Sequence, residues 1–101
     1  MTQTIQLCEK TKRIRNIETG EYTDFLTPIQ YRLYVVLREA DGAIVSQLNI
    51  IDNVYAEDVQ AQGVTPGAIT ALIIRLKRKI STISKADHVK TIRNWGFILE
   101  E

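Results

Sequence analysis

The chain has few of the residues on which enzymes and metalloproteins depend. Its 101 residues include one histidine, His88, and one cysteine, Cys8, far apart in the sequence. A single cysteine excludes an internal disulfide, and this pair cannot supply a metal cluster or a nucleophile with its base. The carboxylates are scattered over expected loops and helix ends, where they are poorly placed for acid–base catalysis. We therefore expect no enzymatic activity, no metal site and no cofactor.

Long apolar runs are also missing. No stretch approaches the roughly 20 apolar residues that a membrane-spanning helix requires, and the polar start MTQTIQ does not resemble a signal peptide. With 45% hydrophobic residues, residues 1–101 have the composition of one soluble domain with a single core. We expect this domain to work in the cytoplasm, with no membrane contact within this segment.

Net charge is low, but the charge is unevenly distributed. The formal net charge is +1, which argues against binding of polyanions by bulk charge alone. Residues 65–95 contain seven Lys and Arg residues and a single acid, Asp87, whereas residues 39–58 contain five acids and no Lys or Arg. This separation predicts one positive face on the folded molecule.

Short strands are predicted at both ends of the chain. Alternating apolar residues indicate three antiparallel strands, TIQLCEK, KRIRNIE and EYTDFL, with a turn at Thr19 and Gly20. The last segment, HVKTIRNWGFILEE, predicts a hairpin that turns around Asn94, Trp95 and Gly96.

Three helices are predicted between these strands. Thr27-Pro28 and Thr65-Pro66 are each an N-cap followed by proline, and Ser46 is a third N-cap candidate. Apolar residues at three- and four-residue spacing continue the helices to about residues 40, 55 and 83. Residues 56–64 show no period and are expected to form a loop. A short helix, a connector and a longer basic helix form a helix-turn-helix unit, and the trailing hairpin is a wing.

This order predicts an α+β fold: a winged helix-turn-helix with an N-terminal antiparallel sheet, three helices and a C-terminal β-hairpin wing. LTPIQYRLYVVLREADGAIVSQLNIIDNVY resembles the run LTxxExxLLxxLxxxxGxVVSRxxLxxxVW of the OmpR/PhoB-type effector domain. ITALIIRLKRKI and KTIRNWGFIL resemble its VxxHIxxLRxKL and TVRGxGYRL. The resemblance covers nearly the whole chain. It implies sequence-specific binding of double-stranded DNA by a bacterial transcription regulator, with the reader helix in the major groove and the wing at the minor groove.

The reader helix, TPGAITALIIRLKRKI, combines an apolar stripe with a basic outer face. The positions that periodicity directs outward, and that we expect to meet DNA, are Thr70, Ala71, Ile74, Arg75, Lys77, Arg78 and Lys79. The Arg75 guanidinium can pair two-pronged with guanine. In the family, the residues that match Arg75 and Lys77 are among those that contact DNA.

Two positions of this helix depart from the family and keep another function open. Leu72 replaces a frequent histidine, and Ile74 replaces a residue that is often polar or basic. An outward Ile74 would pack on thymine methyl groups, or it would belong to the edge of the core. The alternative function is a winged-helix protein-interaction module without DNA binding, in which the basic face is merely solvated.

The wing supplies two further candidates. Arg93 matches the arginine of TVRG, which in the family reaches toward the minor groove, and Thr91 is the matching candidate for a phosphate contact. Asn94 and Trp95 replace the first wing glycine and its neighbour, which leaves the geometry of the turn open. We expect Trp95 to pack over the hairpin rather than to present an exposed ring.

The resemblance also implies protein partners. In the family, the loop before the reader helix contacts the transcription machinery, so Glu57, Asp58, Gln60 and Gln62 are expected to contact RNA polymerase, unless the loop is a plain linker. Homodimers on repeated half-sites are a second expected assembly. With no receiver ahead of the domain, the order resembles ToxR/CadC-type regulators, in which a winged helix precedes a membrane anchor, or a freestanding regulator.

Overall fold

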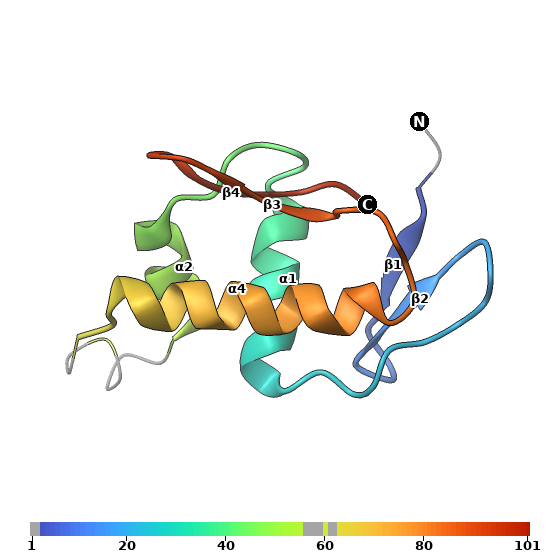
Figure 1. The fold of residues 1–101 in the computed structure, drawn as a ribbon. Helices are drawn as coiled ribbons and strands as arrows, with labels where there is room; N and C mark the ends of the chain where they lie inside the picture. The colour runs from blue at the N-terminus through green and yellow to red at the C-terminus, as the bar shows by residue number, and fades with distance from the viewer. Residues whose placement is uncertain (1–2, 56–59, 61–62) are drawn as a thin grey trace.

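The computed structural model describes residues 3–55, 60 and 63–101, and within them three helices lie between two antiparallel hairpins (Figure 1). The elements in chain order are β1 (Ile5–Cys8), β2 (Arg13–Asn16), α1 (Pro28–Glu39), α2 (Gln47–Val54), α4 (Pro66–Ser81), β3 (Val89–Ile92) and β4 (Gly96–Leu99). This arrangement confirms the expected α+β class and the winged helix-turn-helix architecture.

The helices begin at the predicted N-caps because side chains satisfy their first backbone N–H groups. Thr27 and Gln30 form a capping box at α1: the Thr27 hydroxyl accepts from the backbone N–H of Gln30, and the Gln30 side chain accepts from that of Thr27. Ser46 and Thr65 each accept a hydrogen bond from the backbone N–H three residues on, at the start of α2 and α4. The Thr-Pro pairs therefore fix where α1 and α4 start.

One apolar core joins the helices to both hairpins. Its helical part is made of Leu33, Tyr34, Leu37, Ile50, Val54, Ile69, Leu72, Ile73, Leu76 and Ile80. Ile5, Leu7 and Ile14 add to it from the N-terminal hairpin, and Val89, Phe97 and Leu99 from the C-terminal one. The apolar stripe predicted for the third helix is thus the face by which α4 is fixed to the domain.

A buried tyrosine ties the centre of α1 to the end of the chain. The Tyr34 hydroxyl donates a hydrogen bond to a Glu101 carboxylate oxygen over 2.5 Å. Burial, and then the neighbouring Glu101 carboxylate, raise the pKa of Tyr34 far above its usual value. The hydroxyl therefore stays protonated and remains a donor.

The third predicted strand does not form. β1 and β2 pair regularly from Ile5↔Asn16 to Cys8↔Arg13, but residues 21–26 make only an isolated bridge, Arg15↔Tyr22. Next to this bridge, the backbone N–H of Thr23 donates to the carbonyl of Ile14. The N–H of Ile14, however, donates to the Thr23 hydroxyl rather than to a carbonyl. A side chain that takes over a ladder hydrogen bond in this way competes with regular pairing. The segment consequently follows β2 without becoming a strand.

The wing is a hairpin fastened to the body of the domain. β3 pairs with β4 from Val89↔Leu99 to Ile92↔Gly96. Val45, in the segment before α2, exchanges two backbone hydrogen bonds with Phe97 of β4, at 2.8 and 2.9 Å. This short third element holds the wing next to the start of α2.

Candidate nucleic-acid interface

The outer face of α4 is the predicted reading surface, and the structure leaves it free of the core. Of the residues expected there, Thr70, Ile74, Arg75 and Arg78 are exposed, and Ala71, Lys77 and Lys79 are half-buried. Leu72, by contrast, is buried. Its departure from the family is therefore explained by packing, and it does not belong to the outer surface.

Ile74 lies outside the core. Its side chain is 43% exposed, so the alternative in which it forms the edge of the core is wrong. Leaving a large aliphatic group half in water forgoes part of the free energy that its burial would contribute. An exposed isoleucine on an otherwise polar helix face is thus available for an apolar contact with a partner.

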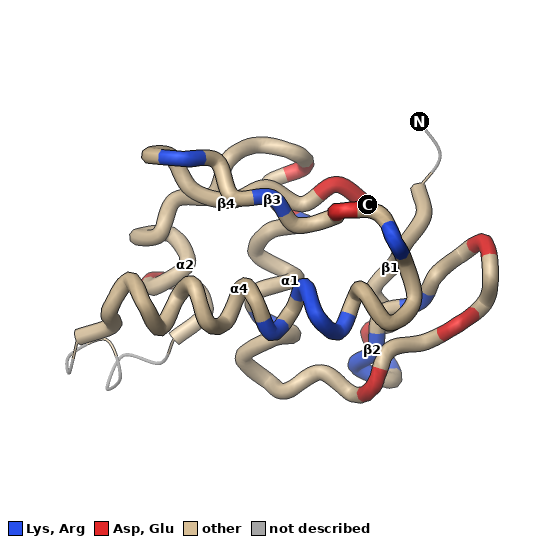
Figure 2. Tube along the Cα trace, in the orientation of Figure 1, with Lys and Arg blue, Asp and Glu red and all other residues tan. Residues whose placement is uncertain are grey.

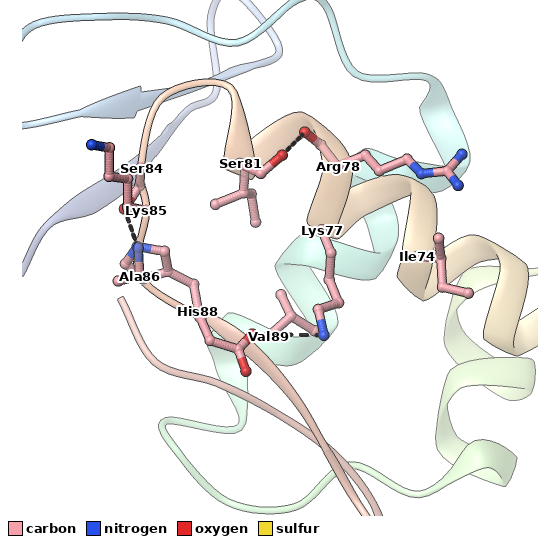
Figure 3. A pocket seen from close by; sticks show the side chains of 11 residues that line it. Ile74, Lys77, Arg78, Ser81, Ser84, Lys85, Ala86, His88 and Val89 are labelled. Carbon is pink, nitrogen blue, oxygen red and sulfur yellow. Dashed lines mark hydrogen bonds and ion pairs between the residues drawn. The ribbon is translucent and has the colours of Figure 1, made fainter.

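A groove separates the second half of α4 from the start of β3 (Figure 3). Its volume is about 600 Å³. The side chains that line it include Ile74, Lys77, Arg78, Ser81, Ser84, Lys85, Asp87 and His88. Ser81, Ser84 and Lys85 were not singled out from the sequence, since they follow the most strongly periodic part of the helix. Cations and hydroxyls on the walls make the groove suited to a phosphate-bearing strand.

Lys77 points across this groove toward the wing. Its Nζ lies 3.6 Å from Oδ1 of Asp87, the only acid between residues 65 and 95. The Lys77 side chain is 42% exposed and that of Asp87 59%, so water and salt screen the pair and it contributes little to stability. In Figure 3 the Arg78 guanidinium extends the other way, away from Ser84 and Lys85. The two neighbouring cations therefore point in different directions.

His88 has a structural position at the groove. It is buried, its Nε2 lies 2.7 Å from the Ser84 hydroxyl, and its Nδ1 lies 2.7 Å from the Glu100 carbonyl. Since a carbonyl only accepts, Nδ1 carries the proton when the ring is neutral, and Nε2 accepts from Ser84. The ring joins the start of the loop after α4 to the residue that follows β4.

The other two cations of α4 lie away from the groove. Arg75 is exposed. Burial raises the pKa of Tyr55, and the positive charge of Arg75 lowers it by a smaller amount. The Lys79 ammonium group donates to the backbone carbonyl of Phe25, in the segment before α1. The four cations thus divide among three surroundings instead of forming one cluster.

The wing tip forms a regular turn although it has no glycine at its third position. Trp95 donates its backbone N–H to Ile92 over 3.0 Å, and Asn94 has φ +72° while Arg93 has a negative φ. A positive φ at the third residue only is the geometry of a type II turn, and asparagine tolerates it better than other non-glycine residues. Asn94 therefore supplies the positive φ of this turn at the position where the family motif has glycine.

The expectation that Trp95 packs over the hairpin is wrong. Its side chain is 71% exposed, and Thr91 and Arg93 beside it are exposed too. A hollow of about 460 Å³ separates the tip from the first turn of α2. The inner side of the hairpin is already filled by Phe97 against Val45, so the ring at the tip extends beyond the packed part of the wing.

Basic residues follow α4 and the wing through the fold. Figure 2 shows Lys and Arg along the second half of α4, in the segment that follows it and at the wing tip. The acids of residues 39–58 that the structure describes, Glu39, Asp41 and Asp52, lie on α1, the turn after it and α2. Residues 65–95, with seven cations and one acid, therefore carry a large excess of positive charge along α4 and the wing.

Three of the four predicted partner-binding residues, Glu57, Asp58 and Gln62, lie outside the described residues. The fourth, Gln60, has helical backbone where a loop was expected. Its side-chain amide donates to the Tyr55 carbonyl over 2.8 Å. Gln60 thus caps the end of α2 by a local hydrogen bond.

Residues 3–55, 60 and 63–101 do not meet the requirements of a membrane-spanning helix or of a metal-binding cluster. No helix in these ranges has both the length and the apolar character needed to cross a membrane. Nor do these ranges bring together three or more His, Cys, Asp or Glu residues in a group that could hold a metal ion.

Solved structures of DNA-binding domains share this fold. The DNA-binding domain of response regulator AdeR, in complex with an intercistronic region, has a TM-score of 0.78 at 11% identity, covering 99% of this chain and 97% of that one. The Escherichia coli CadC DNA-binding domain has a TM-score of 0.76 at 20% identity, covering 98% and 92%. The Klebsiella pneumoniae RstA DNA-binding domain, in complex with the RstA box, has a TM-score of 0.70 at 20% identity, covering 98% and 93%.

The sequence itself identifies the family. Compared with curated protein sequences, the chain has no significant match. Residues 24–99, however, match the family described as transcriptional regulatory protein, C terminal. This match includes all three helices and the wing, and it agrees with the expectation of a regulatory rather than an enzymatic domain. The chain belongs to the transcriptional regulatory protein C-terminal family, the OmpR/PhoB type of winged helix-turn-helix domain.

Proposed function

We propose that this domain binds double-stranded DNA sequence-specifically as the effector domain of a bacterial transcription regulator. The observation that carries the proposal is the pairing of an exposed polar and basic face on α4 with a fastened, basic wing across a groove of about 600 Å³. A B-DNA major groove admits one helix, and a strand of phosphates then lies beside that helix. The groove between α4 and the wing, and the positive charge on both elements, suit a helix in the major groove with a phosphate strand beside it.

In the proposed complex, α4 reads bases from its exposed side. Arg75 is the base contact, since its guanidinium is free of a carboxylate partner among the described residues and can pair two-pronged with guanine. Ile74 packs on a thymine methyl group. Thr70 and Ala71, one turn nearer the start of the helix, contact the adjoining bases or sugar.

Phosphate contacts come from the groove and the wing. Lys77 and Arg78 bind phosphates of the strand between α4 and the wing, and Thr91 donates its hydroxyl to the same backbone. Arg93 enters the minor groove. Lys79 stands apart, because its amine already donates to the Phe25 carbonyl. We assign Lys79 to holding α4 against the N-terminal segment rather than to DNA.

The neighbouring structures support DNA as the partner, since two of them contain it: the AdeR complex with an intercistronic region and the RstA complex with the RstA box. We extend the proposal to a cytoplasmic location, to contact between residues 57–62 and RNA polymerase, and to pairs of domains on repeated half-sites. These extensions rest on the family resemblance.

A second function, a winged-helix module that binds protein and not DNA, is favoured by a specific observation. Exposed apolar side chains occur on three elements, Ile74 on α4, Leu48 on α2 and Trp95 on the wing, and the last two line one hollow. Exposed apolar groups near one another are typical of protein contacts. The seven cations between residues 65 and 95 favour DNA over this alternative.

Selection of bound duplexes from a random pool tests the proposal. The domain should enrich a motif whose length fits one major groove with a flanking minor groove. Failure to retain any duplex at low salt would refute DNA binding and leave the protein-interaction module as the better account.

A further inference from the structure

Trp95 is placed where an aromatic ring has no structural benefit. It is the only tryptophan of the chain, and at 71% exposure its indole forgoes most of the free energy that burial would contribute. The ring is not needed to form the turn, because the backbone N–H of Trp95 makes the closing hydrogen bond to Ile92. Its position therefore calls for a partner outside the chain.

The backbone that carries this ring is held in place. Two hydrogen bonds between Val45 and Phe97 fasten the hairpin two residues from Trp95, and Gly96 lies directly against the backbone of Val45. The Asn94 turn closes the tip. A ring on such a support has little backbone entropy left to lose when it binds, which favours its use as a contact.

The surroundings of the ring fit a polyanion with flat apolar surfaces. Arg93 is two positions away and exposed, and the hollow beside the tip is lined by Thr91, Ser46 and Gln47. Of the two cations of the wing, Lys90 is paired with Glu100 over 3.0 Å, and Arg93 is the cation at the tip. A cation beside an aromatic ring matches the alternation of phosphates with sugars and bases in nucleic acid.

We propose that Trp95 is a DNA contact of the wing, in which the indole packs on deoxyribose and base edges in the minor groove that Arg93 enters. This inference rests on the proposed function and deepens it. Arg93 supplies the salt-dependent attraction, whereas Trp95 supplies an apolar contact that releases no counterions. The contribution of Arg93 to affinity should therefore fall as the salt concentration rises, whereas that of Trp95 should not.

Tryptophan emission reports the contact directly, because no second tryptophan obscures it. Titration of the full chain with an unlabelled duplex selected from a random pool should quench Trp95 emission in proportion to occupancy. Binding itself is followed separately, by the anisotropy of the same duplex carrying a label. Unchanged emission at saturation would overturn the proposal while duplex binding, and with it the proposed function, stands.

Substitutions give the second arm of the test. Trp95→Ala should weaken binding by roughly tenfold, near the low end of what an aromatic contact to nucleic acid contributes, with the salt slope and the thermal midpoint of unfolding unchanged. Trp95→Phe should restore most of the affinity. Phe25→Ala is the matched control, since Phe25 is 69% exposed in the segment before α1 and does not line this hollow, and it should bind as the parent does.

The remaining outcomes distinguish DNA from other partners of Trp95. Equal affinity of Trp95→Ala and the parent would overturn the contact. If Trp95→Ala instead abolishes self-association in sedimentation while each domain binds DNA unchanged, the ring meets a second copy and the proposal is wrong. No binding of any duplex by the parent chain would refute the proposed function and this inference together.

Discussion

Gly96 and Val45 touch through their backbones. A Cβ built on Gly96 would lie 2.1 Å from the carbonyl oxygen of Val45 and 2.8 Å from its carbonyl carbon. Gly96 also has φ +149°, a conformation that is essentially confined to glycine. This single contact sets how closely the wing approaches the start of α2, and hence where Arg93 and Trp95 stand relative to α4.

Gly96→Ala should therefore destabilise the domain and displace the wing. We expect a loss of about 3 kcal/mol in the free energy of unfolding, from backbone strain and from the clash with Val45 together. Gly20→Ala is the control: Gly20 has φ +78°, and the space beside it is open among the described residues. It should cost only about 1 kcal/mol. Denaturant unfolding measures both, and equal losses would show that the contact is unimportant.

Arg75 is expected to read a base. Arg75→Ala should weaken binding to the selected site by roughly 1 to 3 kcal/mol and relax the preference at one base position. Its effect on random-sequence duplex should be much smaller. Competition binding with single-base variants of the site measures this difference. An equal loss on selected and random duplexes would assign Arg75 to the phosphate backbone instead.

Two lysines of α4 form a matched pair for the phosphate contacts. Lys77→Ala should weaken binding to all sequences alike and reduce the salt slope by about 1, because one phosphate contact is lost. Lys79→Ala removes the same charge two residues on, but its amine is engaged at the Phe25 carbonyl. We expect it to change stability more than the salt slope. If both variants lower the slope equally, Lys79 also binds DNA and our assignment of it is wrong.

Arg93 is expected to respond to the shape of the flanking DNA. A narrow, A·T-rich minor groove carries a stronger negative potential, so Arg93 should favour A-tract flanks that no side chain hydrogen-bonds. Arg93→Ala should erase that advantage and leave the preference at the central bases intact. Duplexes that share the core site and differ only in the flanks measure this. A flank dependence that survives the substitution would make the wing a structural element only.

Local signals in the sequence were sufficient for most of the fold. Thr27-Pro28, Ser46 and Thr65-Pro66 marked the helix starts because capping depends on residues three positions apart. The stripe from Ile69 to Ile80 marked the buried face of α4 for the same reason. The prediction of a third strand was wrong because the Thr23 hydroxyl accepts the hydrogen bond from the N–H of Ile14, which a regular strand would have accepted at a carbonyl. Strand propensities of single residues do not predict such competition between a side chain and the backbone.

The site was less predictable, since it depends on contacts between distant segments. The sequence placed Lys79 with the other cations of its helix, and only the fold brings its amine to Phe25. Trp95 was expected to pack because large aromatic rings usually do, but the inner side of the hairpin is filled by Phe97. The groove lined by Ser81, Ser84 and Lys85 likewise exists only when β3 folds back beside α4.

The dependence of duplex affinity on salt tests DNA binding most directly. If Lys77 and Arg78 each neutralise a phosphate and Arg93 displaces a further cation from the minor groove, the logarithm of the association constant should fall with the logarithm of salt concentration with a slope of about −3. Anisotropy of a labelled mixed-sequence duplex across a salt series gives this slope. A slope of about −3 or steeper agrees with the account. Absence of binding at low salt, or an affinity independent of salt, would contradict it.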